Sequence, residues 1–222
     1  MTSGIAVLGG TFDPVHYGHL RSAVAVRDAL LAKEVRMIPS LSPPHRDPPE
    51  SSADHRVAML KAAVEDEPGI VVDDRELYRD GPSYTVDTLR SLRSEVGTDT
   101  TIYFVMGADA FCTLDQWYRW QEIIDQAHIV VLKRPGFPLG IPDEMQSWMN
   151  DKTVVSGSGA SPSDSPHGNV IFLELEQVPV SSTLVRRAIH QGSSTEEMLP
   201  AAVIQYIRCN SLYEQGFSNA ER

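Results

Sequence analysis

The chain has 222 residues, 41% of them hydrophobic and 22% charged, which is typical of one globular unit with a well-formed core. Thirty acidic residues against 19 basic ones give a formal net charge of −11, which disfavours a broad nucleic-acid surface. We expect no membrane segment and no signal peptide, because no apolar run has the required length or position. Two cysteines make no disulfide framework, so the expected setting is the reduced cytoplasm.

Short apolar, β-rich runs alternate with helical patterns along the chain. The predicted strands are Ile5–Leu8, Val35–Ile38, Ile70–Val72, Thr101–Met106 and Ile129–Leu132. The predicted helices between them are Leu20–Leu31, His55–Val64 and Val86–Val96. Because parallel strands need crossover connections, this order predicts an α/β fold, a Rossmann-like doubly wound parallel sheet with a small C-terminal helical part. Ligands of such sheets bind beyond the carboxyl ends of the strands.

Two stretches rich in proline, glycine or serine interrupt this pattern. Residues 42–52 are predicted to be an exposed loop. Residues at about 135–169 are expected to be a flexible insertion that contains a short helix around Asp143–Trp148 and no chemistry of its own. The chain after about Gly216 is expected to fray. The sequence therefore predicts a single domain over residues 1–222.

The strongest local signal is GGTFDPVHYGHL, residues 9–20, directly after the first predicted strand. Gly9 and Gly10 permit a tight turn and a close ligand, and backbone N–H groups near a helix start can cradle phosphate. His16 and His19 share one face if both lie in the first helical turn, and Gly18 would leave space for a ligand. Two imidazole donors there would stabilise charge on the α-phosphate and on departing pyrophosphate. Each histidine alone is more often structural, whereas the complete motif is specific.

A second signal, VPVSSTLVRRAI, lies near the other end of the chain. Ser181, Ser182 and Thr183 precede an apolar helical pattern, which predicts a hydroxyl N-cap. Arg186 follows Ser182 by four residues and shares its face, so hydroxyls, N–H groups and a guanidinium converge where a β- or γ-phosphate would fit. By itself this segment is better explained by a capped helix with a surface arginine, and Arg187 is interpreted as a surface residue.

Together, GxFDPxHxGH and SSTxxR resemble the two phosphate-binding motifs of the nucleotidyltransferase superfamily that transfers a nucleoside monophosphate from a triphosphate. The chain has no GxxxxGK[ST] loop and no GxGxxG turn, which disfavours a P-loop enzyme and a dehydrogenase. Between these two motifs the chain contains five further segments, in the order SPPHR, GPSYTVDTL, MGADAF, DQWYRW and HIVVLKRPG. With these segments the chain resembles the bacterial nicotinate mononucleotide adenylyltransferases from about Ile5 to Tyr213, apart from the insertion.

The resemblance implies a role for individual side chains and main-chain groups. It implies ATP contacts at Gly9, Gly10, Thr11, Phe12, His16, His19, Gly107, Asp109, Ser181, Ser182, Thr183 and Arg186. It implies mononucleotide contacts at Thr11, Arg46, Thr85, Trp117 and Tyr118. Trp117 would stack on the pyridine ring, and the N–H groups of Thr85 and Tyr118 would receive a nicotinate carboxylate, so the acid is preferred over the amide. Trp120 competes with Trp117 as the stacking residue or is a core tryptophan.

Two further expectations follow from the positions that match the family. Asp109 would accept hydrogen bonds from the adenosine ribose, although an aspartate at a helix start looks the same. Arg46 stands where the family commonly has lysine, so the positive charge is kept and its geometry differs, while His45 beside it is as well explained as a solvated loop residue.

The reaction implied is in-line attack of the mononucleotide phosphate on the α-phosphorus of ATP, with His16, His19 and Arg186 as catalytic groups. Mg²⁺ is expected to arrive with ATP, and no clustered carboxylates predict a metal cage. The partners are ATP and nicotinate mononucleotide, with no nucleic acid and no membrane, and a homo-oligomer is left open. Phosphopantetheine adenylyltransferases, which resemble TxGH at the His16 position, and a non-catalytic nucleotide sensor are the alternatives.

Overall fold

The computed structural model describes residues 4–41, 48–79, 81–133, 140–150, 152, 154–156, 165–176 and 178–214. Its strands are β1 (Ile5–Gly10), β2 (Glu34–Pro39), β3 (Ile70–Val72), β4 (Ile102–Gly107), β5 (His128–Lys133), β6 (Val154–Ser156) and β7 (Val170–Glu174). They form one seven-stranded sheet in the order β3-β2-β1-β4-β5-β7-β6, and every neighbouring pair is parallel. The predicted doubly wound parallel sheet is therefore confirmed.

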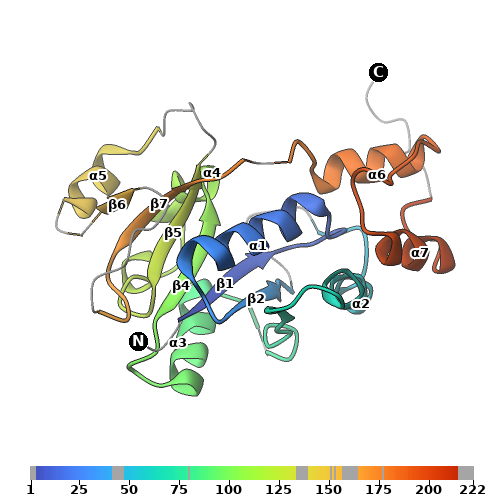
Figure 1. Cartoon of the computed structure of the whole chain (residues 1–222). Helices are drawn as coiled ribbons and strands as arrows, with labels where there is room; N and C mark the ends of the chain where they lie inside the picture. Colours follow the sequence, from blue (N-terminus) through green and yellow to red (C-terminus); the bar gives the residue numbers. More distant parts are fainter. Residues whose placement is uncertain are drawn as a thin grey trace.

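The helices are α1 (Tyr17–Leu30), α2 (Ala53–Val64), α3 (Thr85–Val96), α4 (Ala108–Phe111), α5 (Asp143–Met149), α6 (Ser182–His190) and α7 (Ala201–Cys209). Two short 3₁₀ turns, Leu114–Gln116 and Trp120–Glu122, connect α4 to β5. Figure 1 shows α6 and α7 at one end of the sheet and α5 with β6 at the other. No helix in the described ranges is long and apolar enough to cross a membrane.

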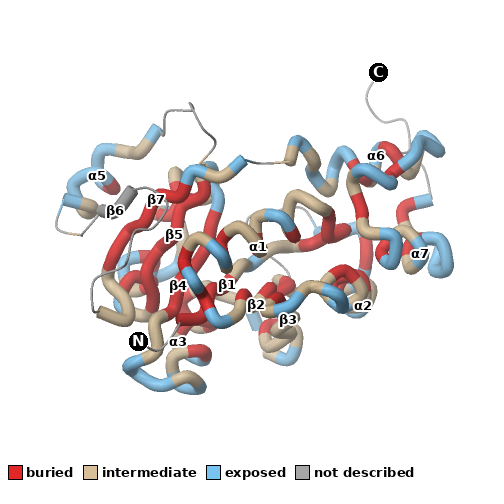
Figure 2. The backbone as a smooth tube through the Cα atoms, in the orientation of Figure 1, coloured by how far each residue is buried: buried red, intermediate tan, exposed pale blue. Residues whose placement is uncertain are grey.

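Alternate side chains of the strands supply two separate cores, one on each face of the sheet. On one face, Ala6 of β1 joins a cluster with apolar residues of α1, α2, α6 and α7. On the other face, Ile5 and Val7 of the same strand join a cluster with α3, α5 and the segment of 3₁₀ turns. Figure 2 shows the resulting gradient, in which the central strands are buried and the outward surfaces of the helices are exposed.

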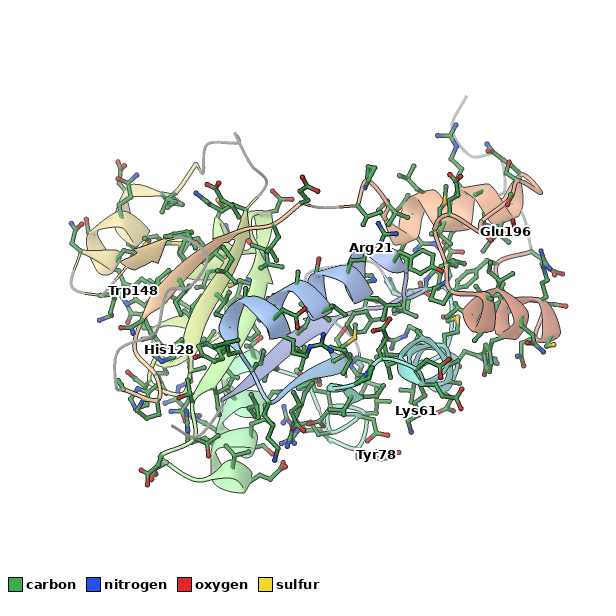
Figure 3. All side chains as sticks on the ribbon, in the orientation of Figure 1. Arg21, Lys61, Tyr78, His128, Trp148 and Glu196 are labelled. Atoms are coloured by element: carbon green, nitrogen blue, oxygen red, sulfur yellow. The ribbon has the colours of Figure 1, made fainter. Side chains whose placement is uncertain are left out.

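The predicted insertion contains more regular structure than the sequence indicated. The short helix is confirmed as α5, and its Met145 is fully buried against the sheet. Trp148 of α5 packs on Trp120 with ring centroids 5.0 Å apart, so this helix is attached to the core. Figure 3 shows Trp148 at the end of the molecule opposite Glu196. The edge strand β6 inside this segment, and β7 directly after it, were not predicted.

Candidate active site

The strand order places a cavity at the point where the chain changes direction along the sheet. After β1 the sheet grows through β2 and β3 to one side, and from β4 it grows to the other side. Such switch points leave a crevice beyond the carboxyl ends of the two central strands. A cavity of about 690 Å³ lies here, with Gly10 of β1 and Gly107 of β4 in its wall.

Most of the residues expected at a nucleotide site line this one cavity. They are Gly9, Gly10, Thr11, Phe12, His16, His19, Thr85, Gly107, Asp109, Trp117, Tyr118 and Ser182. Ser181, Thr183 and Arg186 come from the same helix start as Ser182 but are not part of the lining. Arg46 and His45 lie outside the described residues. The fold therefore brings segments of the chain that are more than 150 positions apart to one site.

The two histidines begin α1 and stack on each other. His16 is the N-cap of α1, and His19 occupies the third helical position, so the helix starts three residues before the predicted Leu20. Their ring centroids are 3.7 Å apart with an angle of 21° between the planes. The His16 main-chain N–H donates to His19 Nδ1 at 3.3 Å, which is one half of a capping box at the start of α1. The His19 ring is thereby held at the wall of the cavity.

Burial determines the charge of the other imidazole. His16 is 6% exposed, and loss of hydration lowers its pKa to about 4. The His16 ring is therefore neutral near pH 7 in the free site. A neutral imidazole still donates one N–H, so His16 can contact a phosphate as a dipole rather than as a cation.

Gly18 lines the cavity, as expected of a residue that leaves space for a ligand, and the absence of its side chain also makes room for neighbouring protein atoms. A Cβ atom at position 18 would lie 2.9 Å from Nδ1 of His16 and 3.1 Å from Cγ1 of Val180. Any side chain there would displace the His16 ring. By contrast, a Cβ at Gly9 or at Gly107 would meet no protein atom within 4 Å, and both residues line the cavity. Gly9 and Gly107 therefore leave open space at the cavity wall.

The start of α6 is attached to the histidine motif by its polar side chains. Ser181 is the N-cap and accepts from the Leu184 N–H at 3.2 Å, as predicted. The Ser182 hydroxyl donates to the Pro14 carbonyl at 3.0 Å. Arg186 Nη1 donates to the Asp13 carbonyl at 2.8 Å, while its Nε pairs with Glu50 at 2.6 Å. Thr183 and Arg187 are exposed.

A buried aspartate organises the loop between β1 and α1. Asp13 is 3% exposed, and its carboxylate accepts hydrogen bonds from the Glu50 N–H at 2.7 Å and the Ser51 N–H at 3.2 Å. The Ser51 and Tyr213 hydroxyls also donate to it, at 2.6 and 2.7 Å. Burial raises the pKa of the Tyr213 phenol, so this group remains a protonated donor. Sequence reasoning did not assign this role to Asp13, although the residue lies inside the motif.

Aromatic rings surround the part of the cavity next to α3. Thr85 is the first residue of α3, where main-chain N–H groups lie beyond the reach of intrahelical acceptors. Tyr84, its N-cap, lies against Tyr118 with ring centroids 4.3 Å apart. Trp117 is partly buried and contacts Phe104 edge-on at 6.4 Å. Trp120 is 9% exposed and belongs to the core, so Trp117 is the tryptophan available to the cavity.

Several lining residues were not predicted from the sequence. Tyr84, Ser83 and Thr88 flank the predicted Thr85, so their place at a helix start is the signal that could have identified them. Glu76 is 8% exposed, lines the cavity and accepts from the Thr88 hydroxyl at 2.7 Å. Burial raises the pKa of the Glu76 carboxyl, and no motif marked this residue.

Among the described residues, no group of three or more His, Cys, Asp or Glu side chains is arranged to hold a metal ion. The two cysteines, Cys112 and Cys209, are free thiols.

A parallel doubly wound sheet with a histidine motif at its switch point defines a class of nucleotidyl-transferring proteins. The chain matches the cytidylyltransferase-like family over residues 7–188, and it belongs to this family.

Within that family the chain is one of the nicotinate-nucleotide adenylyltransferases. A relative from Pseudomonas entomophila (strain L48), named "probable nicotinate-nucleotide adenylyltransferase", is 43% identical over 214 residues, 94% of each chain. The fold is shared with the nicotinic acid mononucleotide adenylyltransferase of Plasmodium falciparum, solved in complex with NaAD and, separately, with APC. The TM-scores are 0.72 and 0.70 at 16% identity, and each comparison covers 97% of this chain and 100% of the other. The resemblance found in the motifs is thus confirmed over nearly the whole chain.

Proposed function

We propose that the protein transfers AMP from ATP to nicotinate mononucleotide, giving nicotinate adenine dinucleotide and pyrophosphate. The observation that carries this proposal is that one cavity contains both the histidine pair of α1 and the aromatic group next to α3. The first suits a triphosphate, and the second suits a flat pyridine ring. The reaction proceeds in the reduced cytoplasm in this proposal.

Transfer is a single displacement at the α-phosphorus of ATP. A phosphate oxygen of the mononucleotide forms the new P–O bond, the bond to the bridging oxygen of pyrophosphate breaks, and pyrophosphate leaves with the electron pair. The attacking oxygen is already anionic at neutral pH, so no general base is needed. The protein contributes position and charge stabilisation.

In this proposal the polar groups of the cavity divide between the two substrates. His16 and His19 donate to the reacting phosphates, and the start of α6 with Arg186 holds the leaving pyrophosphate. Asp109 receives the ribose hydroxyls of ATP. Magnesium enters with ATP and neutralises its phosphate oxygens.

The acceptor is recognised by its ring and its carboxylate. Trp117 stacks on the pyridine, and the main-chain N–H groups of Thr85 and Tyr118 receive the carboxylate. The neutral amide of nicotinamide mononucleotide would bring an NH₂ donor toward these donors. We therefore propose a preference for the acid.

The test is pyrophosphate release from Mg-ATP, measured with nicotinate mononucleotide, nicotinamide mononucleotide, phosphopantetheine and no acceptor. We expect rapid release and a dinucleotide product with nicotinate mononucleotide, and a kcat/KM at least about tenfold lower with the amide, the size of one lost charged hydrogen bond. Turnover with phosphopantetheine alone would contradict the acceptor. Binding of ATP without release for any acceptor would indicate a nucleotide sensor instead.

A further inference from the structure

The largest fully buried side chain of the described residues is a charged one, Arg56 of α2. It is 1% exposed. Its Nη1 donates to the main-chain carbonyls of Thr11 and Ser40, both at 2.7 Å, and its Nη2 donates to the carbonyl of Leu41 at 3.2 Å. Burial lowers the pKa of Arg56 and the nearby Asp13 carboxylate opposes this effect, so the guanidinium remains charged. A buried cation is costly unless its contacts are needed.

The carbonyls that Arg56 binds belong to the wall of the cavity, whereas Arg56 does not. Thr11 and Ser40 both line the cavity, and they follow the adjacent strands β1 and β2. The Ser40 N–H donates to the Gly10 carbonyl at 2.9 Å, which joins the two strand ends directly. Arg56 therefore binds both strand ends from behind the wall.

The direction of the Thr11 carbonyl fixes the direction of the Phe12 N–H, because both belong to one peptide unit. In a trans peptide the C=O and the N–H of the same unit point in opposite directions. The Thr11–Phe12 peptide is trans, because Asp13–Pro14 is the cis bond recorded for the described chain. With the Thr11 oxygen directed at Arg56, the Phe12 N–H points away from Arg56, and Phe12 lines the cavity. A rotated peptide would present a carbonyl oxygen, which repels phosphate.

We propose that Arg56 is a positioning residue for adenylyl transfer, holding the Thr11 carbonyl behind the cavity wall so that the Phe12 N–H faces a bound phosphate group. This inference rests on the proposed function. An N–H fixed in advance stabilises negative charge without reorganisation during the reaction. Arg56 reaches no substrate itself and acts through the main chain of the turn after β1.

Arg93 provides a matched control elsewhere in the molecule. It lies in α3, and its guanidinium also donates hydrogen bonds to main-chain carbonyls, including those of Gly97 at 3.0 Å and Gln126 at 2.5 Å. These acceptors precede β4 and β5, so they lie at the amino ends of the strands, away from the cavity. Burial lowers the pKa of Arg93 as well. Both guanidinium groups bind main-chain carbonyls, but of the two only Arg56 binds carbonyls of residues that line the cavity.

The first experiment compares Arg56→Lys and Arg56→Met with Arg93→Lys and Arg93→Met. We expect the Arg56→Met enzyme, assayed below its melting temperature, to lose at least about tenfold in kcat/KM for both substrates, the size of one displaced donor. Arg56→Lys should recover part of the loss, because the ammonium can still bind one carbonyl. The Arg93 variants should melt earlier with kcat and KM within twofold of wild type. Wild-type kinetics in a folded Arg56 variant, or equal losses in the Arg93 variants, would overturn the inference.

The second experiment uses the unaltered protein and does not depend on the folding of any variant. Inorganic triphosphate is titrated into the ¹⁵N-labelled chain, and the amide resonances are followed by NMR. The Phe12 amide proton should move downfield on binding, as expected for a new hydrogen bond to an anion, while the Gly97 amide stays unchanged. Triphosphate binding with a stationary Phe12 amide would overturn the inference. An inactive wild-type enzyme would instead contradict the proposed function, so the two failures are distinguishable.

Discussion

At the scale of single residues, the two imidazoles of the motif have different environments within one stacked pair. His16 is buried, neutral and confined by Gly18, which has no side chain to displace it. His19 is only partly buried, lines the cavity and accepts the main-chain N–H of His16 at Nδ1. Phe12 contacts the His19 ring edge-on at 4.9 Å. His16 therefore supports the position of the His19 ring at the cavity wall.

Replacing His19 should affect catalysis far more than folding. We expect His19→Ala to lower kcat by about 10²–10³, the usual loss for one donor to developing charge, because the ring fills no core position. The melting temperature should change by a few degrees at most. His55→Ala is the control, since His55 bonds to the Tyr206 hydroxyl at 2.9 Å outside the cavity. Near-normal turnover of His19→Ala would remove His19 from the mechanism.

At the scale of elements, the segment between β4 and β5 places two tryptophans in different environments. Trp117 lines the cavity, while Trp120, three residues later, packs between the sheet and Trp148 of α5.

Trp117→Ala should raise KM for nicotinate mononucleotide much more than KM for ATP and leave the melting temperature nearly unchanged. Trp120→Ala should do the reverse, costing about 3–5 kcal/mol of stability as a large core deletion. Steady-state kinetics and thermal melts of the pair check this, and a larger kinetic effect at Trp120 would reverse the assignment.

The attachment of β5 to residues 165–169 makes stability sensitive to pH. His128 is fully buried, and its two ring nitrogens contact the Ser165 carbonyl at 2.9 Å and the Asn169 N–H at 3.1 Å. Burial lowers its pKa from 6.5 to about 4, as it does for His16. Between these two values the unfolded chain binds the additional proton, so stability is complete above pH 6.5 and is lost as pH falls toward 4.

We therefore expect the free energy of unfolding to decrease between pH 6.5 and pH 4, by up to about 1.4 kcal/mol per pH unit for each buried histidine. His128→Gln should lower stability at pH 7 and also reduce this slope. Urea melts at several pH values measure both quantities, and His55→Gln serves as the control. An unchanged slope in His128→Gln would show that His128 is not the group responsible.

The sequence predicted the strands from the β3 edge of the sheet to β5 and missed β7 and β6 at the other edge, for a physical reason. Strands β1 to β5 and helices α1 to α3 carry apolar patterns bounded by turn residues, and all of them, including the three-residue strand β3, appear within a few positions of the predicted bounds. The edge strand β6 has three residues, and β7 is a five-residue run behind a Gly/Ser/Pro-rich stretch. Pairing with β5 stabilises β7, and that contact is not encoded locally.

In the site, too, the residues that could be predicted are those in local motifs, and the others depend on contacts between distant segments. Residues within a contiguous motif, such as His19, could be predicted because their spacing encodes the geometry. Glu76 and Arg56 could not, because each gains its role only when distant segments are folded together: Glu76 meets Thr88 of α3, and Arg56 meets the ends of β1 and β2. Arg186 is intermediate, since its motif predicted a phosphate contact but not its bonds to Asp13 and Glu50.

At the scale of the whole molecule, the cavity joins the beginning of the chain to its end. Arg186 of α6 reaches the Asp13 carbonyl, and Tyr213 beyond α7 reaches the Asp13 carboxylate. The cavity wall also includes residues of both apolar clusters, such as Phe12 and Phe104. A ligand in this cavity therefore binds the folded chain and not its separate parts, so binding stabilises the entire domain by mass action.

ATP at 100 times its dissociation constant should stabilise the domain by about 2.7 kcal/mol, which for a chain of this size raises the melting temperature by roughly 5–10 °C. Arg186→Ala should lose most of the shift with Mg-ATP and keep the shift with nicotinate mononucleotide, because the guanidinium is assigned to the leaving phosphates. Arg187→Ala, its exposed neighbour, should behave as wild type. Thermal melts with each ligand measure the shifts, and equal ATP shifts in the two variants would exclude Arg186 from the triphosphate site.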